Sequence, residues 1–405
     1  MPDGDDRPLS RAPRWVDVRS EGLGLPATER YTRREFIASA VGGLLASTVP
    51  WRDVRAAGQW PGYARAMVID GCGSPGNSRT EASGALLASM VEDVRRSGLT
   101  CVNVTVGPVG TRPSDEAFAQ AVSDIEFWDG QVDANSEVFA KVRTVADLDA
   151  AKRAGRTGLA YAFQDGVSFQ EDLARLEVFQ RLGVRVIQPT YNRHNLLGDG
   201  CLESVDAGLS RVGVEAIERM NALGILVDLS HCGRQTAADA LRVSKAPVVF
   251  THTGCAALAD HPRNRTDAEL HAVAQKGGVA GIYFMPYLDV GHQATADLVI
   301  RHLEHAIGVA GEDHVSIGTD GGVSAEVDDE AYRHDFAESV RKRREAGIGA
   351  PGESETAYPF AADLNSPRRL EWLATRLSAR GHGDRRIEKI LGANLRRVFA
   401  ETWTG

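Results

Sequence analysis

Eight short apolar runs, rich in β-branched residues, alternate along this chain with segments of helical periodicity, and this alternation constrains the fold more than any other feature. The runs are MVIDG (67–71), TCVNVTVG (100–107), GLAYAFQ (158–164), RVIQPTY (185–191), ILVDLSH (225–231), PVVFTHT (247–253), GGVAGIYF (277–284) and HVSIGTD (314–320). Strands joined by helical crossovers run parallel, so their carboxyl ends meet at one edge of the sheet. Eight such units predict an α/β fold, the (β/α)8 TIM barrel.

Three of the segments between the runs, residues 81–98, 171–183 and 210–224, end in glycine, the residue that commonly ends a helix. An open, doubly wound parallel sheet is the alternative topology. It is disfavoured because the first strand–helix turn lacks the glycine-rich signature of a dinucleotide site. Nearly every polar candidate lies at the carboxyl end of a run, which is where barrel active sites lie.

Two long segments interrupt the alternation. Residues 108–157 include an acidic stretch of helical character that contains Trp128 and Phe139. Residues 321–365 are charged and contain glycine and proline, which predicts a surface loop over the barrel mouth. Residues 366–399 then predict two amphipathic helices that close the chain. Residues 61–405 are therefore expected to form a single domain.

His231 and His252 end two of the runs, one strand–helix–strand unit apart, with Thr236 as a cap of the helix between them. A lone histidine in such a place would more often bond to backbone, but two in matching positions favour a shared metal ion. His302 and His305, three residues apart on an expected helix, fit a solvated face better than a metal site. The five cysteines show no CxxC pair, and Cys232 and Cys255 are expected to be buried packing residues.

The first 60 residues carry an export signature rather than a fold. TRREFI (32–37) contains the pair Arg33-Arg34, and the apolar run ASAVGGLLASTV (38–49) follows, with a small-residue cleavage site near Ala56-Ala57. This arrangement is typical of a twin-arginine signal. It predicts recognition by the twin-arginine translocation machinery and export to the periplasm or the extracellular space. The net charge of −9, without a basic stripe, argues against nucleic acid as a partner.

Several longer motifs resemble those of one known family. They are GDGCLESVDAGLSRVG (198–213), MNALGILVDLSH (220–231), FTHT (250–253), HPRNRTD (261–267), IGTDGG (317–322) and KILGANLRRVF (389–399). Together they are similar to the membrane dipeptidase (renal dipeptidase) family of metallopeptidases, over about residues 65–400. The resemblance implies a barrel of the metal-dependent hydrolase type that carries two zinc ions and hydrolyses dipeptides. Family members are commonly homodimers, so a homodimer is the assembly to test.

The resemblance also implies roles for particular residues. His231 and His252 match the two histidines that hold one zinc, and Asp320 matches the aspartate that touches the other metal and transfers protons. Arg263 matches the arginine that grips the substrate carboxylate, a task that suits its forked guanidinium. Tyr191 lies where many relatives place a histidine near the scissile carbonyl.

Three positions depart from the family pattern. Where relatives read DGHND, this chain reads DGCGS, which puts Cys72 and Ser74 in place of a histidine and an aspartate. Gln164 replaces the glutamate that bridges the two metals, and a neutral amide bridges two cations poorly. We therefore expect one tightly bound zinc per chain rather than two. His231 and His252 would hold it, with Gln164, Asp320 or Cys72 as a further ligand. Asp165 is another oxygen donor but is expected to point away.

Three functions remain open from the sequence. The first is a metal-dependent hydrolase of the dipeptidase type, acting on a dipeptide or similar small amide, with Asp320 as general base. The second is a barrel that has lost hydrolysis and binds a small carboxylate through Arg263. The third is a hydrolase or lyase of the same fold that acts on another small molecule.

Overall fold

The computed structural model describes residues 59–83 and 86–403. Residue contacts divide the chain into Met1–Pro50 and Trp51–Gly405, and the barrel belongs to the second unit. The predicted export signal lies outside the described residues except for its last two positions. None of the helices in the described ranges combines the length and the hydropathy needed to cross a membrane.

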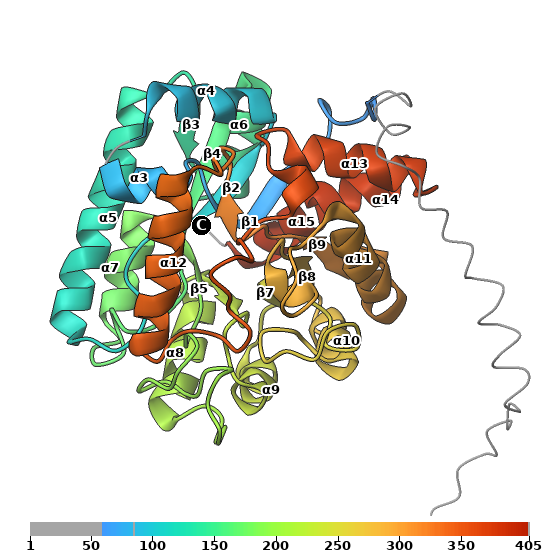
Figure 1. Ribbon diagram of the computed structural model, residues 1–405. Coiled ribbons are helices and arrows are strands. Elements are labelled where there is room, and N and C mark those ends of the chain that lie inside the picture. The colour runs from blue at the N-terminus through green and yellow to red at the C-terminus, as the bar shows by residue number, and fades with distance from the viewer. Residues whose placement is uncertain (1–58, 84–85, 404–405) are drawn as a thin grey trace, which may run out of the picture. The chain divides into compact units, whose positions relative to one another are not determined.

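The strands form a single parallel sheet that curls into a barrel (Figure 1). They are β1 (Ile69–Ser74), β2 (Cys101–Thr105), β3 (Phe139–Lys141), β4 (Thr157–Phe163), β5 (Val184–Ile187), β6 (Leu226–Asp228), β7 (Val248–Thr253), β8 (Val279–Ile282), β9 (Val315–Ile317) and β10 (Gly321–Gly322). Their order is β10-β1-β2-β4-β5-β6-β7-β8-β9, with β3 paired to β4. β10 follows β9 after three residues, and Gly321 of β10 pairs with Gly73 of β1. The two edges of the sheet therefore meet, which confirms the predicted barrel.

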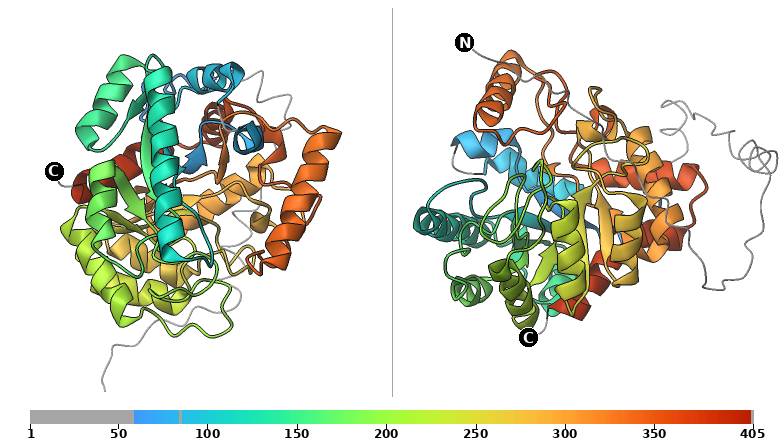
Figure 2. Two further views of the ribbon diagram at one scale, coloured as in Figure 1. Left: turned by 90° about the vertical axis from the view of Figure 1, so that its left-hand side faces the viewer. Right: turned by 90° about the horizontal axis from the view of Figure 1, so that it is seen from below.

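Helices surround the barrel on its outer face (Figures 1 and 2). They are α3 (Ser78–Ser83), α4 (Ala88–Ser97), α5 (Ser114–Ala134), α6 (Val145–Ala154), α7 (Arg175–Leu182), α8 (Arg211–Ala222), α9 (Arg234–Val243), α10 (Asp267–Gln275), α11 (Ala296–Ala310), α12 (Glu330–Glu345), α13 (Arg369–Ala379), α14 (Asp384–Glu388) and α15 (Asn394–Thr402). Two of the expected glycine stops, Gly98 and Gly183, cap α4 and α7 in the left-handed conformation, with φ of 69° and 104°.

Glycines inside the barrel let β1, β8 and the end of β9 pack closely against β7. A Cβ atom on Gly281 or Gly318 would lie 2.1 or 1.9 Å from the carbonyl oxygen of Thr251, and one on Gly71 would lie 3.0 Å from it. No side chain fits at the two shorter distances, so Gly281 and Gly318 are required for close approach rather than for an unusual φ, and at Gly71 a side chain would be tightly packed. The consequence is that β1 and β9 lie near β7, which brings residues following β9 close to His252.

The two long insertions differ from their predicted form. Residues 321–365 contain the four-turn helix α12 as well as loops. The periodic pattern was hidden because only Tyr332 and Val340 of α12 are buried, and its exposed positions are highly charged. Phe139 begins the short strand β3 and is not helical. α12 lies beside α3 (Figures 1 and 2), where Arg79 forms an ion pair with the α12 cap residue Asp329.

Three further expectations need correction. The closing segment forms α13, α14 and α15 rather than two helices, with a π-helical segment at Lys389–Ala393 between the last two. Helix α9 begins at Arg234 with Gly233 as its cap, because the Thr236 hydroxyl instead bonds to Asp206. His302 is buried and bonds to the Cys255 amide and the Leu288 carbonyl, so it does not lie on a solvated face.

Candidate metal centre and substrate cavity

Two histidine rings meet at the carboxyl ends of β6 and β7. The Nε2 atoms of His231 and His252 lie 3.0 Å apart, and both side chains are buried. Burial, followed by the nearby Arg263 guanidinium, holds the pKa of each imidazole well below its ordinary value. Both rings are therefore neutral at physiological pH, which is the form that binds metals.

The hydrogen bonds at the opposite ring nitrogen fix the tautomer of His231. Its Nδ1 lies 2.7 Å from Oδ1 of Asn192. The Asn192 amide is oriented by its own nitrogen, which donates to the Ile348 carbonyl at 2.9 Å. An amide oxygen only accepts, so Nδ1 of His231 carries the proton and Nε2 presents a lone pair.

A different set of hydrogen bonds fixes the same tautomer of His252, with the proton on Nδ1. Asp228 accepts hydrogen bonds from the Thr251 hydroxyl at 2.5 Å and from the Thr251 amide at 3.0 Å. The Thr251 hydroxyl proton is thereby committed to Asp228, so its oxygen accepts from Nδ1 of His252 at 2.8 Å. Two bare nitrogens facing each other at 3.0 Å repel unless a cation binds both of them, which makes this pair a candidate metal site.

Asp320 lies next to His252, just after the end of β9. Among the described residues it is the one non-glycine residue in the left-handed region, with φ of 57°. Its amide donates to the Cys72 carbonyl at 2.9 Å, and Asp70 clamps the preceding residue, Thr319, through its amide at 2.8 Å and its hydroxyl at 2.6 Å. Asp70 thus holds the strand end before Asp320 as Asp228 holds the strand end before His252.

Cys72, His252 and Asp320 offer ligand atoms that all lie within 4.8 Å of one another. The Cys72 sulfur is 3.8 Å from Oδ1 of Asp320. Burial raises the pKa of Asp320 to about 6, partly offset by Arg263, and it raises the pKa of the Cys72 thiol well above its ordinary value. His252, Asp320 and Cys72 are therefore candidate ligands of one divalent cation, and Nε2 of His231 lies beside that of His252 as a further donor.

The residues at the second position do not fit another cation. The Gln164 amide nitrogen donates to the Thr105 hydroxyl at 2.8 Å and lies 3.5 Å from the Cys72 sulfur. The Ser74 hydroxyl accepts from the Gly76 amide in a local turn. Neither residue supplies the negative charge that a second divalent ion requires. Asp165 points away, as expected, and accepts from the Gly110 amide and the Asn195 side chain, both at 2.8 Å.

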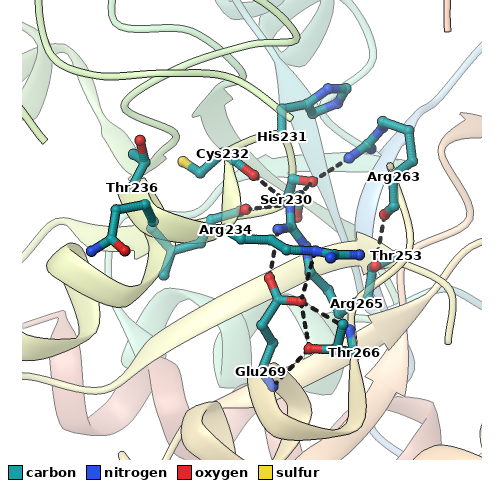
Figure 3. Close-up of polar contacts among 12 residues, drawn as sticks. Ser230, His231, Cys232, Arg234, Thr236, Thr253, Arg263, Arg265, Thr266 and Glu269 are labelled. Carbon is teal, nitrogen blue, oxygen red and sulfur yellow. Dashed lines mark hydrogen bonds and ion pairs between the residues drawn. The ribbon is translucent and has the colours of Figure 1, made fainter. Parts of the chain in front are cut away.

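Two buried arginines follow β7, and they have different roles (Figure 3). Arg265 donates to the carbonyls of Leu229, Ser230 and Cys232 and pairs with Glu269 at 3.0 Å, so it fixes the backbone beside His231. Arg263 donates one Nη to the Ser230 carbonyl, whereas its Nη2 is buried without a hydrogen-bond partner. The His231 ring and the Arg263 guanidinium extend to the same side, away from Glu269.

Tyr191 stacks on His231, with ring centroids 4.0 Å apart and planes inclined by 25°. Its hydroxyl interacts with Arg343 of α12, which forms an ion pair with Glu353 at 3.0 Å. Tyr191, Cys72, Gln164 and Asp320 all line a cavity of about 1480 Å³ at the barrel mouth. His231, His252 and Arg263 are not among its lining residues.

Sequence reasoning missed Asn192, Asp70, Asp228 and Arg343. For the two aspartates the sequence held a signal, because the same pattern occurs twice. An aspartate lies near the end of one strand (IDGC, VDLS). A threonine that directly precedes a candidate ligand lies at the end of another (GTD, FTH). Asn192 and Arg343 gave no signal, since their contacts join segments about 150 residues apart.

The fold and this centre define a class of protein: a (β/α)8 barrel with a histidine-based candidate cation site at the carboxyl ends of its strands. The membrane dipeptidase family (peptidase family M19) matches residues 81–344. The chain belongs to this family of metallopeptidases.

Two curated relatives carry dipeptidase in their names. The chain is 31% identical over 207 residues to dipeptidase verJ of Clonostachys rogersoniana and 37% identical over 175 residues to an uncharacterised dipeptidase of Schizosaccharomyces pombe. These matches cover 51% and 41% of this chain, and the chain spans about half the length of the curated relatives, 53% and 42%. An amidohydrolase from Pseudomonas aeruginosa superposes with a TM-score of 0.72 at 31% identity, over 84% of this chain and 98% of the other.

Proposed function

We propose that this protein is an exported, zinc-dependent dipeptidase that holds one zinc ion per chain and cleaves dipeptides or similar small amides. The observation that carries the proposal is the pair of bare Nε2 atoms 3.0 Å apart, each fixed by a hydrogen bond at its other ring nitrogen. His231 and His252 would hold the ion, with Asp320 and Cys72 as the further donors. When bound, such an ion lowers the pKa of water and polarises a carbonyl.

The chain's own residues supply the rest of the reaction. In the metal-free protein burial raises the pKa of Asp320 to about 6, so its carboxylate is largely ionised at neutral pH and would accept a proton from the attacking water. A C–O bond forms as the peptide C–N bond breaks, and Asp320 passes the proton to the leaving amine. Arg263 holds the substrate carboxylate through its unpartnered Nη2. Burial raises the pKa of Tyr191, so its hydroxyl stays protonated and able to donate to the substrate carbonyl.

The direct test is hydrolysis of a dipeptide panel by protein that has been stripped with a chelator and then reloaded with zinc. We expect cleavage after reloading and none after stripping. Binding of dipeptides without cleavage in the reloaded protein would instead favour a barrel that only binds carboxylates, an outcome that the neutral Gln164 would explain.

Export is tested by replacing Arg33 and Arg34 with lysine, which should retain the protein in the cytoplasm.

Metal binding should release protons in a number that identifies the ligands. At pH 7.5 the histidines are neutral and Asp320 is ionised, but Cys72 remains a thiol. Zinc binding should then release about one proton per ion, and about two at pH 5, where Asp320 is mostly protonated. Affinity should accordingly rise with pH. Calorimetry in buffers of different ionisation enthalpy measures this number. Cys72→Ser should release no proton at pH 7.5, and an unchanged release would remove Cys72 from the ligand set.

Arg263→Lys should weaken substrate binding by about 1–3 kcal/mol, because one ammonium group cannot bond both the Ser230 carbonyl and a carboxylate in the forked geometry. The dissociation constant of a dipeptide measures the effect. Arg265→Lys is the matched control: it breaks backbone contacts and should lower the melting temperature while leaving the affinity near its original value. Normal affinity in Arg263→Lys would exclude Arg263 from the substrate site.

A further inference from the structure

The cavity at the barrel mouth is much larger than a dipeptide requires. Its volume is about 1480 Å³, whereas pockets of about 300–1,000 Å³ accommodate drug-sized ligands. Its floor includes Cys72, Gln164 and Asp320, so it is continuous with the candidate metal centre. Residues of α5 and α12 line much of it, together with residues that follow β8, such as Met285 and Tyr287. Most of this space therefore lies beyond the atoms that would react.

The surroundings of Arg263 are confined. The Arg263 side chain is 2% exposed, and Tyr283, whose ring lies 6.0 Å from the guanidinium, is fully buried. The Thr253 hydroxyl donates to the Arg263 carbonyl, which ties that segment to β7. The free Nη2 of Arg263 is itself buried, so a carboxylate reaches it only when neighbouring side chains move, and a large side chain next to that carboxylate would meet packed protein.

These two observations fix the direction of a bound dipeptide. Its carboxylate lies at Arg263 and its peptide bond lies between the histidine pair and Asp320. The residue on the amino side of that bond must then point toward the cavity that Asp320 and Cys72 line. This step rests on the proposed function, because it assumes that Arg263 binds the carboxyl end.

We infer that the α5–α12 cavity is a binding site for a large aromatic side chain on the amino-terminal residue of the substrate, and that the carboxyl-terminal residue is small. Aromatic rings line both walls: Phe127 and Trp128 on α5, and Tyr332 and Phe336 on α12. Aromatic pairs in offset or edge-on contact stabilise one another beyond the area that they bury. A bulky aromatic group entering between these helices would therefore bind more tightly than an aliphatic one of similar size.

The test uses the zinc-loaded protein and reduced-amide analogues, in which CH2–NH replaces the peptide bond and prevents hydrolysis. We expect the Trp-Gly analogue to bind at least about tenfold more tightly than the Gly-Trp analogue in calorimetry. Equal affinity, the reverse order, or no binding of either analogue would overturn the inference. Cleavage of the parent dipeptides is measured separately. Tighter binding of the Trp-Gly analogue without cleavage of either dipeptide would overturn the proposed dipeptidase activity alone. Cleavage of dipeptides without tighter binding of the Trp-Gly analogue would overturn the inference alone.

Variants that fill the cavity provide a second test. Ser123 on α5 and Ser339 on α12 are exposed and line the cavity, so Ser123→Trp and Ser339→Trp should each weaken binding of the Trp-Gly analogue by about tenfold. Binding of the Gly-Gly analogue should not change. Glu126→Trp is the control, because Glu126 is exposed on the same helix as Ser123 but does not line the cavity. An equal effect of all three tryptophans on both analogues would contradict the assignment.

Discussion

Replacing His252 with alanine should lower the affinity for zinc by more than about 100-fold, which exceeds the loss caused by mutating groups that merely orient a ligand. The variant loses one of the two bare nitrogens, and the remaining Nε2 of His231 has no imidazole to share the ion with. Competition with a chromophoric chelator measures the affinity. Dipeptide cleavage should disappear with the ion.

His302→Ala is the matched control for this variant. His302 is also buried, but it bonds to the Cys255 amide and the Leu288 carbonyl and lies outside the candidate centre. Its loss should cost about 1–3 kcal/mol of folding free energy and leave zinc affinity unchanged. If zinc affinity fell equally in both variants, the effect of His252→Ala would reflect a damaged fold rather than a lost ligand.

The second large effect concerns the three departures from the family pattern. The triple variant Cys72→His, Ser74→Asp and Gln164→Glu should bind a second zinc and gain dipeptidase activity over the parent. The two carboxylates add the negative charge that two divalent cations require, and the imidazole completes the second site. Elemental analysis and the initial rate of cleavage measure the two effects.

Single changes should have little effect, because a partly built site still repels its second ion, and the combination should be strongly non-additive. Gln164→Glu alone is the most informative control, since it tests the bridging position by itself. If the parent already cleaves dipeptides as fast as the triple variant, the native residues support the chemistry without a second ion. If the triple variant binds two zinc ions and cleaves nothing, the substrate cavity has also diverged.

The barrel was predictable because its signal is local and repeated. Each of the eight runs contains at least half of one strand, and glycines such as Gly98 and Gly183 end helices where expected. Helix α12 was missed for a physical reason. It packs on the protein through few buried residues, so its apolar periodicity is weak, and its helical character rests on capping by Asp329 and on charge pairs such as Glu338 with Lys342.

The site was predictable only at the level of residue types. The matching strand ends indicated His231 and His252, and the family resemblance indicated Asp320, but a linear sequence does not say which ring nitrogen carries a proton. That depends on Asn192, whose orientation is set by the Ile348 carbonyl in the segment after α12. The interaction of Tyr191 with Arg343 similarly joins distant segments. Such contacts arise from the closed barrel and its mouth, and no local pattern records them.

The number of zinc ions in the native protein tests the central claim most directly. The protein is purified without added zinc, dialysed against metal-free buffer, and analysed for metal and protein by elemental analysis and amino-acid quantification. The donor set of His231, His252, Asp320 and Cys72, with neutral Gln164 beside it, predicts one tightly held zinc per chain. Two tightly held ions per chain would contradict this account, and so would a protein that holds none even after zinc is supplied.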